Sequence, residues 1–298
     1  MRKIGWWLLV GLAVGGGVTY MAASNMAGRE AKLAIERLVT ENEEVESLEY
    51  SDLTVGLLEQ GGKINDVRLQ LKGIEDPIVI DQLQLENVAQ KEGRTVQADV
   101  SMEGLTLKHD HALLESITPE LEAMGYAEVV VDATAAYQYD PQKRRLTLEK
   151  IDLSAKDMGK LSMAIILDQV NPELWEVKKE GLNLGAFLTT FALVSIGPSK
   201  IEYEDHSLLK RWIKRQAQRS GHRPEAVVRQ WRRVIDQEAN RNNSSIAQAA
   251  LGAVKDFLAD PDRITVRIAP EKPLALMRFV LESPERILEN LQLQVESH

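Results

Sequence analysis

The stretch Val129–Leu167, VVVDATAAYQYDPQKRRLTLEKIDLSAKDMGKLSMAIIL, decides the fold. Apolar residues alternate with polar ones along three runs, and Asp140-Pro141 and Asp157-Met158-Gly159 supply turn residues between them. The apolar positions that alternate in this way are Val129, Val131, Ala133, Ala135, Tyr137, Leu146, Leu148, Ile151, Leu153, Leu161, Met163, Ile165 and Leu167. The connections are too short for parallel crossovers, so the pattern predicts an antiparallel meander.

A second meander is expected upstream of this one. The same period of two returns near residues 53–57, 64–71, 78–85 and 96–102, with turn residues between the runs. Helical spacing of apolar residues instead predicts helices over Gly28–Val45 and Ala112–Met124. The sheet is expected to have one wet face.

The C-terminal part predicts mainly helices. We expect a helix over Pro172–Ile196, whose apolar second half, Leu182–Ile196, packs on the sheet. The other expected elements are strands at 201–204, 264–268 and 291–295, and helices at 207–219, 224–240, 245–258, 273–281 and 284–290. The last strand would return the C-terminus to the sheet.

Together these elements predict an α+β protein with a curved antiparallel sheet packed with helices. The expected division is a transmembrane anchor over 1–24, a mainly antiparallel β region over 25–170, and a helix-rich region over 171–298. The last region holds a basic helical insert at 206–260 and terminal strands that complete the sheet.

The N-terminus carries a candidate membrane anchor. Met1-Arg2-Lys3 is basic, and Ile4–Ala23 has no charge, which is long enough for a helix to cross the hydrocarbon core of a bilayer. Trp6, Trp7 and Tyr20 lie where aromatic rings favour the headgroup layers. We expect a single-pass protein of the bacterial inner membrane, with a cytoplasmic N-terminus and its bulk in the periplasm. A cleaved signal peptide is the competing interpretation.

Two glycines in this run form a small-xxx-small pair. Gly11 and Gly15 would let a second membrane helix approach closely, although glycine is frequent in membrane helices for other reasons. The rest of the chain has the composition of a folded domain, with 44% hydrophobic and 27% charged residues in the whole sequence. The absence of cysteine excludes disulfides, thiolate metal sites and a lipid anchor on cysteine.

Positive charge is concentrated in the helical insert. Between His206 and Arg241 there are ten Lys and Arg against three acidic residues, in a chain whose net charge is −9. Trp212 and Trp231 are interleaved with these cations. The candidate contact residues for anionic lipid or an acidic partner are Lys210, Arg211, Lys214, Arg215, Arg229, Arg232 and Arg233. An ordinary solvated face, with the two tryptophans as core anchors, explains the pattern as well.

No catalytic motif accompanies these features. His109-Asp110-His111 is the only histidine cluster, and a solvated turn explains it better than a metal site, since no further ligand has a recognisable spacing. Ser195 lacks the first glycine of a nucleophile elbow. We therefore expect no enzyme activity, no cofactor and no metal. Nucleic acid is not expected as a partner, because the domain is expected on the far side of the membrane.

The meanders carry a second hypothesis. A curved sheet closed by an amphipathic helix can enclose a groove lined with Leu, Ile, Val and Met, and such grooves bind acyl chains. Alternatively, Leu182–Ile196 fills the groove and leaves a core without a ligand.

Three segments carry a resemblance to a known family. The sequences LEYSDLTV (48–55), GKINDV (62–67) and IVIDQL (78–83) resemble the opening strands of AsmA-like envelope proteins, which also follow an N-terminal membrane helix. The segments from Tyr137 to Leu161 and from Lys272 to Leu293 resemble patterns in uncharacterised proteobacterial envelope proteins. The resemblance implies lipid movement and outer-membrane homeostasis, and supplies no functional residue. This chain differs in being short and in having the basic insert.

The function expected from the sequence is non-catalytic handling of a lipid or hydrophobic ligand in the envelope, with membrane lipids as partners. The alternative is an accessory or scaffold subunit of a larger envelope complex, or a homo-oligomer, that docks through Gly11 and Gly15 or through the helical insert.

Overall fold

The computed structural model describes residues 44–56, 61–91, 94–171, 192–242 and 244–298. The expected anchor, with Gly11 and Gly15, and most of the expected helix 172–196 lie outside these residues. No helix of the described part is long and apolar enough to cross a membrane. The fold is α+β with a large antiparallel sheet, as expected from the sequence.

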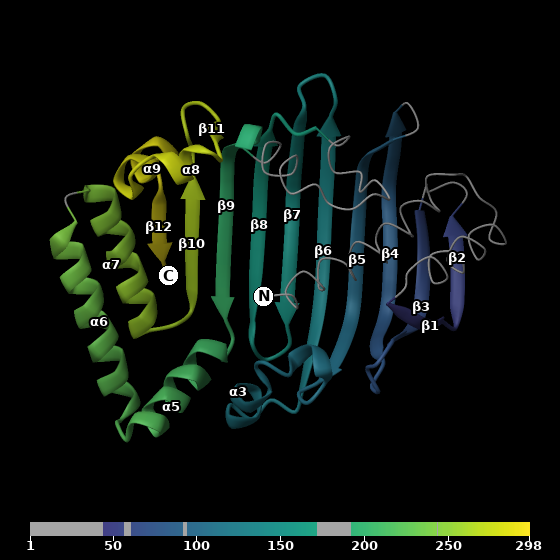
Figure 1. The fold of residues 1–298 in the computed structure, drawn as a ribbon, viewed down its shortest axis with the longest axis horizontal. Helices are drawn as coiled ribbons and strands as arrows, with labels where there is room; N and C mark the ends of the chain where they lie inside the picture. Colours follow the sequence, from purple (N-terminus) through teal and green to yellow (C-terminus); the bar gives the residue numbers. More distant parts are fainter. Residues whose placement is uncertain (1–43, 57–60, 92–93, 172–191, 243) are drawn as a thin grey trace. The chain divides into compact units, whose positions relative to one another are not determined.

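Twelve strands of the described residues form the sheet, in the order β1-β3-β4-β5-β6-β7-β8-β9-β10-β12, with β2 paired to β3 and β11 paired to β9 (Figure 1). The chain divides into two compact units, and the division falls within β6 and β7. Unit 1 contains residues 1–137 and 152–156, and unit 2 contains residues 138–151 and 157–298.

Unit 1 is built mainly from strands. Its elements are β1 (Val45–Glu49), β2 (Asp52–Gly56), β3 (Gly61–Leu71), β4 (Ile78–Lys91), β5 (Arg94–Lys108), η1 (Ala112–Leu114), α3 (Thr118–Ala123) and most of β6 (Glu128–Asp140). Strands β2 to β5 confirm the expected first meander. The apolar face of β3 and β4 is buried and continues onto part of β5. Val67, Ile80, Leu85 and Leu107 are each 1% exposed, whereas Val100 and Met102 of β5 are only partly buried.

Two expectations for unit 1 are wrong. Val45 does not end a helix but begins β1, because residues 45–49 pair with the second half of β3, including Leu48 with Leu69. Residues 28–43 of that expected helix lie outside the described residues. The expected helix Ala112–Met124 is split into η1 and α3. The break is held by the Thr118 hydroxyl, which donates to the carbonyls of His109 and Leu114.

Unit 2 combines the other end of the sheet with helices. Its elements are β7 (Arg145–Ala155, shared with unit 1), β8 (Gly159–Asp168), β9 (Ser195–Asp205), α5 (Leu208–Ser220), α6 (Pro224–Arg241), α7 (Ser245–Ala259), β10 (Arg263–Ile268), β11 (Leu274–Ala275), α8 (Arg278–Leu281), α9 (Pro284–Leu291) and β12 (Gln294–Ser297). The three helices of the basic insert, strand β10 and the return of the C-terminus to the sheet were all expected.

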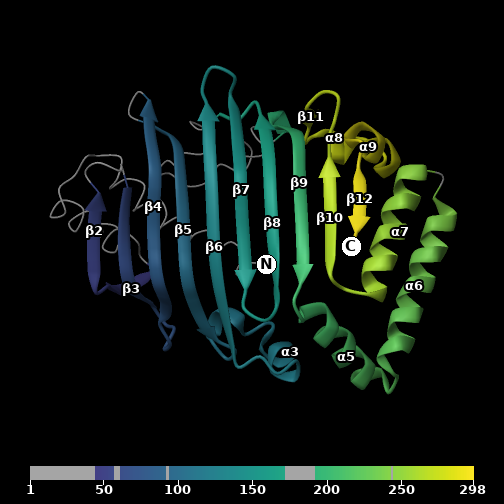
Figure 2. The same ribbon diagram turned by 180° about the vertical axis from the view of Figure 1, so that it is seen from behind.

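The helices of unit 2 are arranged around β9, β10 and β12. Helix α7 packs against β12 and β10, and α6 packs on α7, which lies between α6 and β12 in both views (Figures 1 and 2). Phe257 of α7 contacts Tyr203 of β9 edge-on, with ring centroids 6.1 Å apart. Helix α5 lies at one end of these strands, and α8 and α9 lie at the opposite end.

Two expectations for unit 2 are also wrong. The strand expected at 201–204 extends from Ser195, so Ser195 and Ile196 do not end a helix. Gly197 and Pro198 are accommodated where the β8–β9 register shifts between Ile165 and Leu167. The expected helix 273–281 is reduced to α8, because Leu274 pairs with Ile196 in β11 and joins a small core with Ile287 and Leu291.

Candidate functional site

The candidate site lies in unit 2, at the corner where β9 leads into α5. A cavity of ≈ 310 Å³ that is largely open to solvent lies there, and its walls are Tyr203, Leu208, Leu209 and Trp212. This volume is at the lower end of the range typical of small-molecule sites. The lining surface is almost entirely apolar. We call this cavity the corner pocket.

The corner is fixed by the turn between β7 and β8. The Met158 carbonyl accepts hydrogen bonds from the backbone N–H groups of His206, Ser207 and Leu208, each at 3.1 Å, and the Ser207 hydroxyl donates to the Asp157 carbonyl. These contacts satisfy donors that the first turn of a helix leaves unpaired. The Asp157-Met158-Gly159 turn, recognised from the sequence, therefore also sets the start of α5.

Asp205 joins the strand to the helix. Its side chain is 5% exposed, and its Oδ1 accepts hydrogen bonds from the Tyr203 hydroxyl at 2.8 Å and from the Leu209 N–H at 2.7 Å. The position of this carboxylate at the N-terminus of α5 is electrostatically favourable. Its Oδ2 is buried and makes no hydrogen bond within the described residues. Since both partners of Oδ1 line the corner pocket, Asp205 holds two of its walls in place.

Tyr203 forms one wall of the corner pocket, and its side chain is held in place from several sides. Besides its hydrogen bond to Asp205, its ring packs on Phe257 and lies over Gly159. A Cβ at position 159 would stand 2.6 Å from the Glu204 carbonyl oxygen and 2.9 Å from the Tyr203 hydroxyl. Glycine at this position is therefore a requirement of the Tyr203 placement.

Trp212 forms the outer wall of the corner pocket. It stacks on Trp231 of α6, with ring centroids 4.8 Å apart and 27° between the ring planes, and remains 39% exposed. Stacking of this kind contributes about 0.5–1.5 kcal/mol beyond area burial. The interpretation of Trp212 as a buried core anchor is wrong, because the stack joins α5 to α6 at the surface.

The seven cations expected to contact anionic groups lie on α5 and α6 but do not form one patch. Lys210, Lys214, Arg229 and Arg233 are exposed, and none of the four forms an ion pair with a described residue, whereas Arg211, Arg215 and Arg232 are partly buried. At 3.6 residues per turn, each exposed cation lies about 160° around its helix from the stacked tryptophan. The result is two outward cationic faces, one on each helix.

The other sequence candidates have structural roles. His111 is 1% exposed; its Nε2 donates to the Asp76 carbonyl, and its Nδ1 accepts from the Leu113 N–H at the start of η1. The expectation of a solvated turn is therefore wrong for His111. His109 Nδ1 donates to the Ala127 carbonyl. No group of three potential metal ligands occurs in the described part of the chain. Ser195 is buried in β9.

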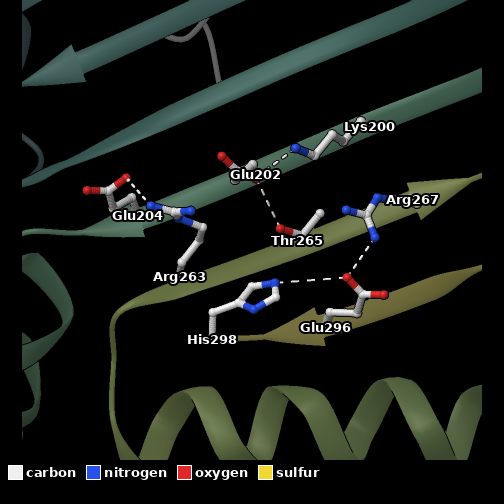
Figure 3. A network of polar contacts seen from close by, with 8 residues as sticks. All are labelled: Lys200, Glu202, Glu204, Arg263, Thr265, Arg267, Glu296 and His298. Carbon is white, nitrogen blue, oxygen red and sulfur yellow. Dashed lines mark hydrogen bonds and ion pairs between the residues drawn. The ribbon is translucent and has the colours of Figure 1, made fainter.

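One face of β9, β10 and β12 is charged, and Figure 3 shows its contacts. The pairs Lys200–Glu202, Arg263–Glu204 and Arg267–Glu296 are joined at 2.8, 3.3 and 2.6 Å. The buried Thr265 hydroxyl donates to Glu202 at 3.2 Å. Each carboxylate has its own cation, so this face is balanced in charge. We attribute to it a role in solubility and strand register.

Comparisons with known proteins assign no activity to this site. A family model described only as an uncharacterised protein matches residues 152–298. The matched stretch contains the whole corner pocket and the turn that positions it. No curated protein matches the chain.

The sequence pointed to α5 and α6 but not to the corner pocket. Its walls are Tyr203, which lies in the expected strand, Trp212, and Leu208 and Leu209, which resemble ordinary core residues. The one local signal was Asp205, an acidic residue just before a helix, which is typical of a residue that caps helix N–H groups.

Proposed function

We propose that the protein is a non-catalytic, membrane-anchored protein of the bacterial envelope that holds a lipid or other hydrophobic ligand. The corner pocket is the observation that carries the proposal. Its walls are apolar, one of them is a half-exposed tryptophan, and the Asp205 contacts keep it open. An acyl chain is the chemistry that such a surface favours, at about 0.8 kcal/mol per buried CH₂ group.

The sheet beside the corner pocket offers a longer apolar surface. Leu161 of β8 pairs with Tyr203 of β9, and Met163 pairs with Ile201, so the apolar row continues across the strands. All of these side chains are only partly buried. A chain longer than the corner pocket would find further apolar contacts along this row.

The exposed cations support a membrane surface as the setting. Each Lys or Arg near an anionic membrane contributes about 1 kcal/mol of attraction. Two outward faces would hold α5 and α6 at the headgroup layer. The N-terminal anchor and the periplasmic location belong to the same proposal and rest on the first 23 residues of the sequence.

Lipid retention tests the corner pocket. The full chain is purified in mild detergent and examined by native mass spectrometry and lipid extraction. We expect one bound lipid in the wild type and none in Leu208→Trp, which fills the cavity. Val234→Trp is the matched control, because Val234 is 59% exposed on α6. Equal lipid content in all three proteins would contradict the proposal.

Charge reversal tests the cationic faces separately. Lys210→Glu with Lys214→Glu should weaken binding of the folded region to anionic vesicles, whereas Lys72→Glu with Lys272→Glu should not, although all four lysines are exposed. Each removed cation should cost roughly fivefold in partitioning, and reversal should cost more. Binding unaffected by the first pair would refute the role of α5.

A scaffold is the second candidate function, and the surface of the helical insert favours it. Large apolar side chains are exposed on α5 and α6, where Trp212 is 39% and Val234 is 59% exposed. Crosslinking of the full chain in its native membrane separates the two candidates. Recovery of one stoichiometric protein partner through α5 or α6, without bound lipid, would favour the scaffold.

A further inference from the structure

Among the described residues of unit 2, the most exposed apolar group lies at the end of the strands opposite to the corner pocket. Met277, Phe279, Val280 and Leu281 are 43%, 45%, 81% and 74% exposed. We call these four residues the apolar turn. Leu193, which is 63% exposed, lies beside the apolar turn. Its neighbour in sequence, Val194, accepts a hydrogen bond through its carbonyl from the N–H of Leu276, the residue before Met277.

The backbone of the apolar turn is held in place by buried side chains and polar contacts. Leu274 pairs with Ile196 in the sheet and is buried with Ile287 and Leu291 of α9. Arg278 forms an ion pair with Glu282 at 2.5 Å, and the Asn290 side chain donates to the same carboxylate. The exposed side chains are therefore presented by a fixed backbone, and no described residue covers them.

The size and charge of this surface decide what covers it. A stable protein interface needs about 20–30 residues on each side, and this group is far smaller. Insertion into a bilayer needs only a few apolar side chains. The charges around it are mixed: Lys272 and Arg286 are exposed, as are Glu271, Glu285 and Glu289. The surroundings therefore give no net attraction for an anionic surface.

In the proposed function, the N-terminal anchor tethers the domain to a bilayer. The 21 residues between Ala23 and Val45 span at most about 75 Å when extended. An anchored domain would meet the membrane at a high effective concentration.

We propose that the apolar turn inserts into the interfacial layer of a bilayer, by hydrophobic contact and not by charge. This inference rests on the membrane location in the proposed function. It gives the domain a second membrane contact, separate from α5 and α6 and insensitive to salt. Phe279, Val280 and Leu281 are the inserting side chains.

The absence of cysteine allows a direct test. Val280→Cys in the full chain carries the only thiol, and an environment-sensitive fluorophore on it reports burial in phosphatidylcholine vesicles. We expect a blue shift, and quenching by lipids spin-labelled in the upper acyl chain. Val234→Cys, at a position on α6 that is 59% exposed, should show neither. Adding Leu281→Ser should lower the inserted fraction about tenfold.

The remaining outcomes each decide the question. A water-like spectrum at position 280 in vesicles would overturn the inference, as would a blue shift that grows with protein concentration without lipid, which would indicate self-association. Leu208→Trp should leave insertion unchanged. If lipid stays in the corner pocket while position 280 remains in water, only the insertion fails.

Discussion

The two units use the same alternation of apolar and polar residues but bury it to different extents. In unit 1, Val67 and Ile80 form a paired row with each side chain 1% exposed. In unit 2, the paired row of Met163, Ile201 and Val266 is only partly buried. A period of two thus predicts a strand, but not how completely its apolar face is covered. The incompletely covered face is the one beside the corner pocket.

Matched isoleucines give the largest expected contrast. Ile80→Ala should lower the free energy of unfolding by about 3–4 kcal/mol, because it leaves a cavity in a closed core. Ile201→Ala should cost about 1–2 kcal/mol, because the side chain is already partly in contact with solvent. Urea titration of the full chain measures both. Equal losses would show that the two faces are equally packed and would remove the basis of the comparison.

The second expected effect comes from the turn that supports the corner pocket. Gly159→Ala should cost about 2 kcal/mol, because the new Cβ would overlap the Glu204 carbonyl and the Tyr203 hydroxyl. Gly252→Ala is the control. Its Cβ meets nothing within 4 Å in the middle of α7, so it should stabilise by up to about 1 kcal/mol. In thermal unfolding, the Tm of Gly159→Ala should be lower than that of the wild type, and the Tm of Gly252→Ala should be higher.

Asp205→Ala tests the polar support of the corner pocket. The loss of the carboxylate removes the acceptor for the Leu209 N–H and the Tyr203 hydroxyl, and we expect about 1–2 kcal/mol of destabilisation. Retained lipid should fall as well. Asp256→Ala, at an exposed position on α7, should change stability by less than about 0.5 kcal/mol. Unchanged lipid retention in Asp205→Ala would mean that the pocket walls do not depend on this residue.

The charged face should give the smallest effect. Arg267→Ala breaks an exposed pair with Glu296 and should cost no more than about 0.5 kcal/mol.

The hydrogen bond and charge of Lys200 lower the pKa of Glu202. The ionised Glu202 side chain therefore stabilises the folded state at neutral pH, and this stabilisation is lost as the pH falls through the acidic range. The difference in denaturation midpoint between Glu202→Gln and wild type should shrink on acidification, and a difference that grows would contradict this sign.

The sequence predicts the strands and helices better than it predicts their surroundings. The alternation of β6 to β8 and the spacing of α5 to α7 each follow from one local period, and the structure confirms them. Val45 and Ser195 were assigned to helices, because only pairing with β3 and β8, respectively, reveals them as strand residues.

The candidate site shows the same limit. Lys210 and Lys214 were found because charge is visible in the sequence, whereas the corner pocket depends on Tyr203 and Leu209 meeting through Asp205. Contacts of this kind arise from tertiary packing, and the spacing of residues in the sequence does not predict them.

The most direct test of the corner pocket is to map where an acyl chain touches the protein. The full chain is reconstituted with a phospholipid that carries a photoreactive group on its acyl chain, and the adducts are located by tandem mass spectrometry. We expect adducts on the segment from Tyr203 to Trp212, and their loss in Leu208→Trp but not in Val234→Trp. Adducts confined to other parts of the chain would contradict it.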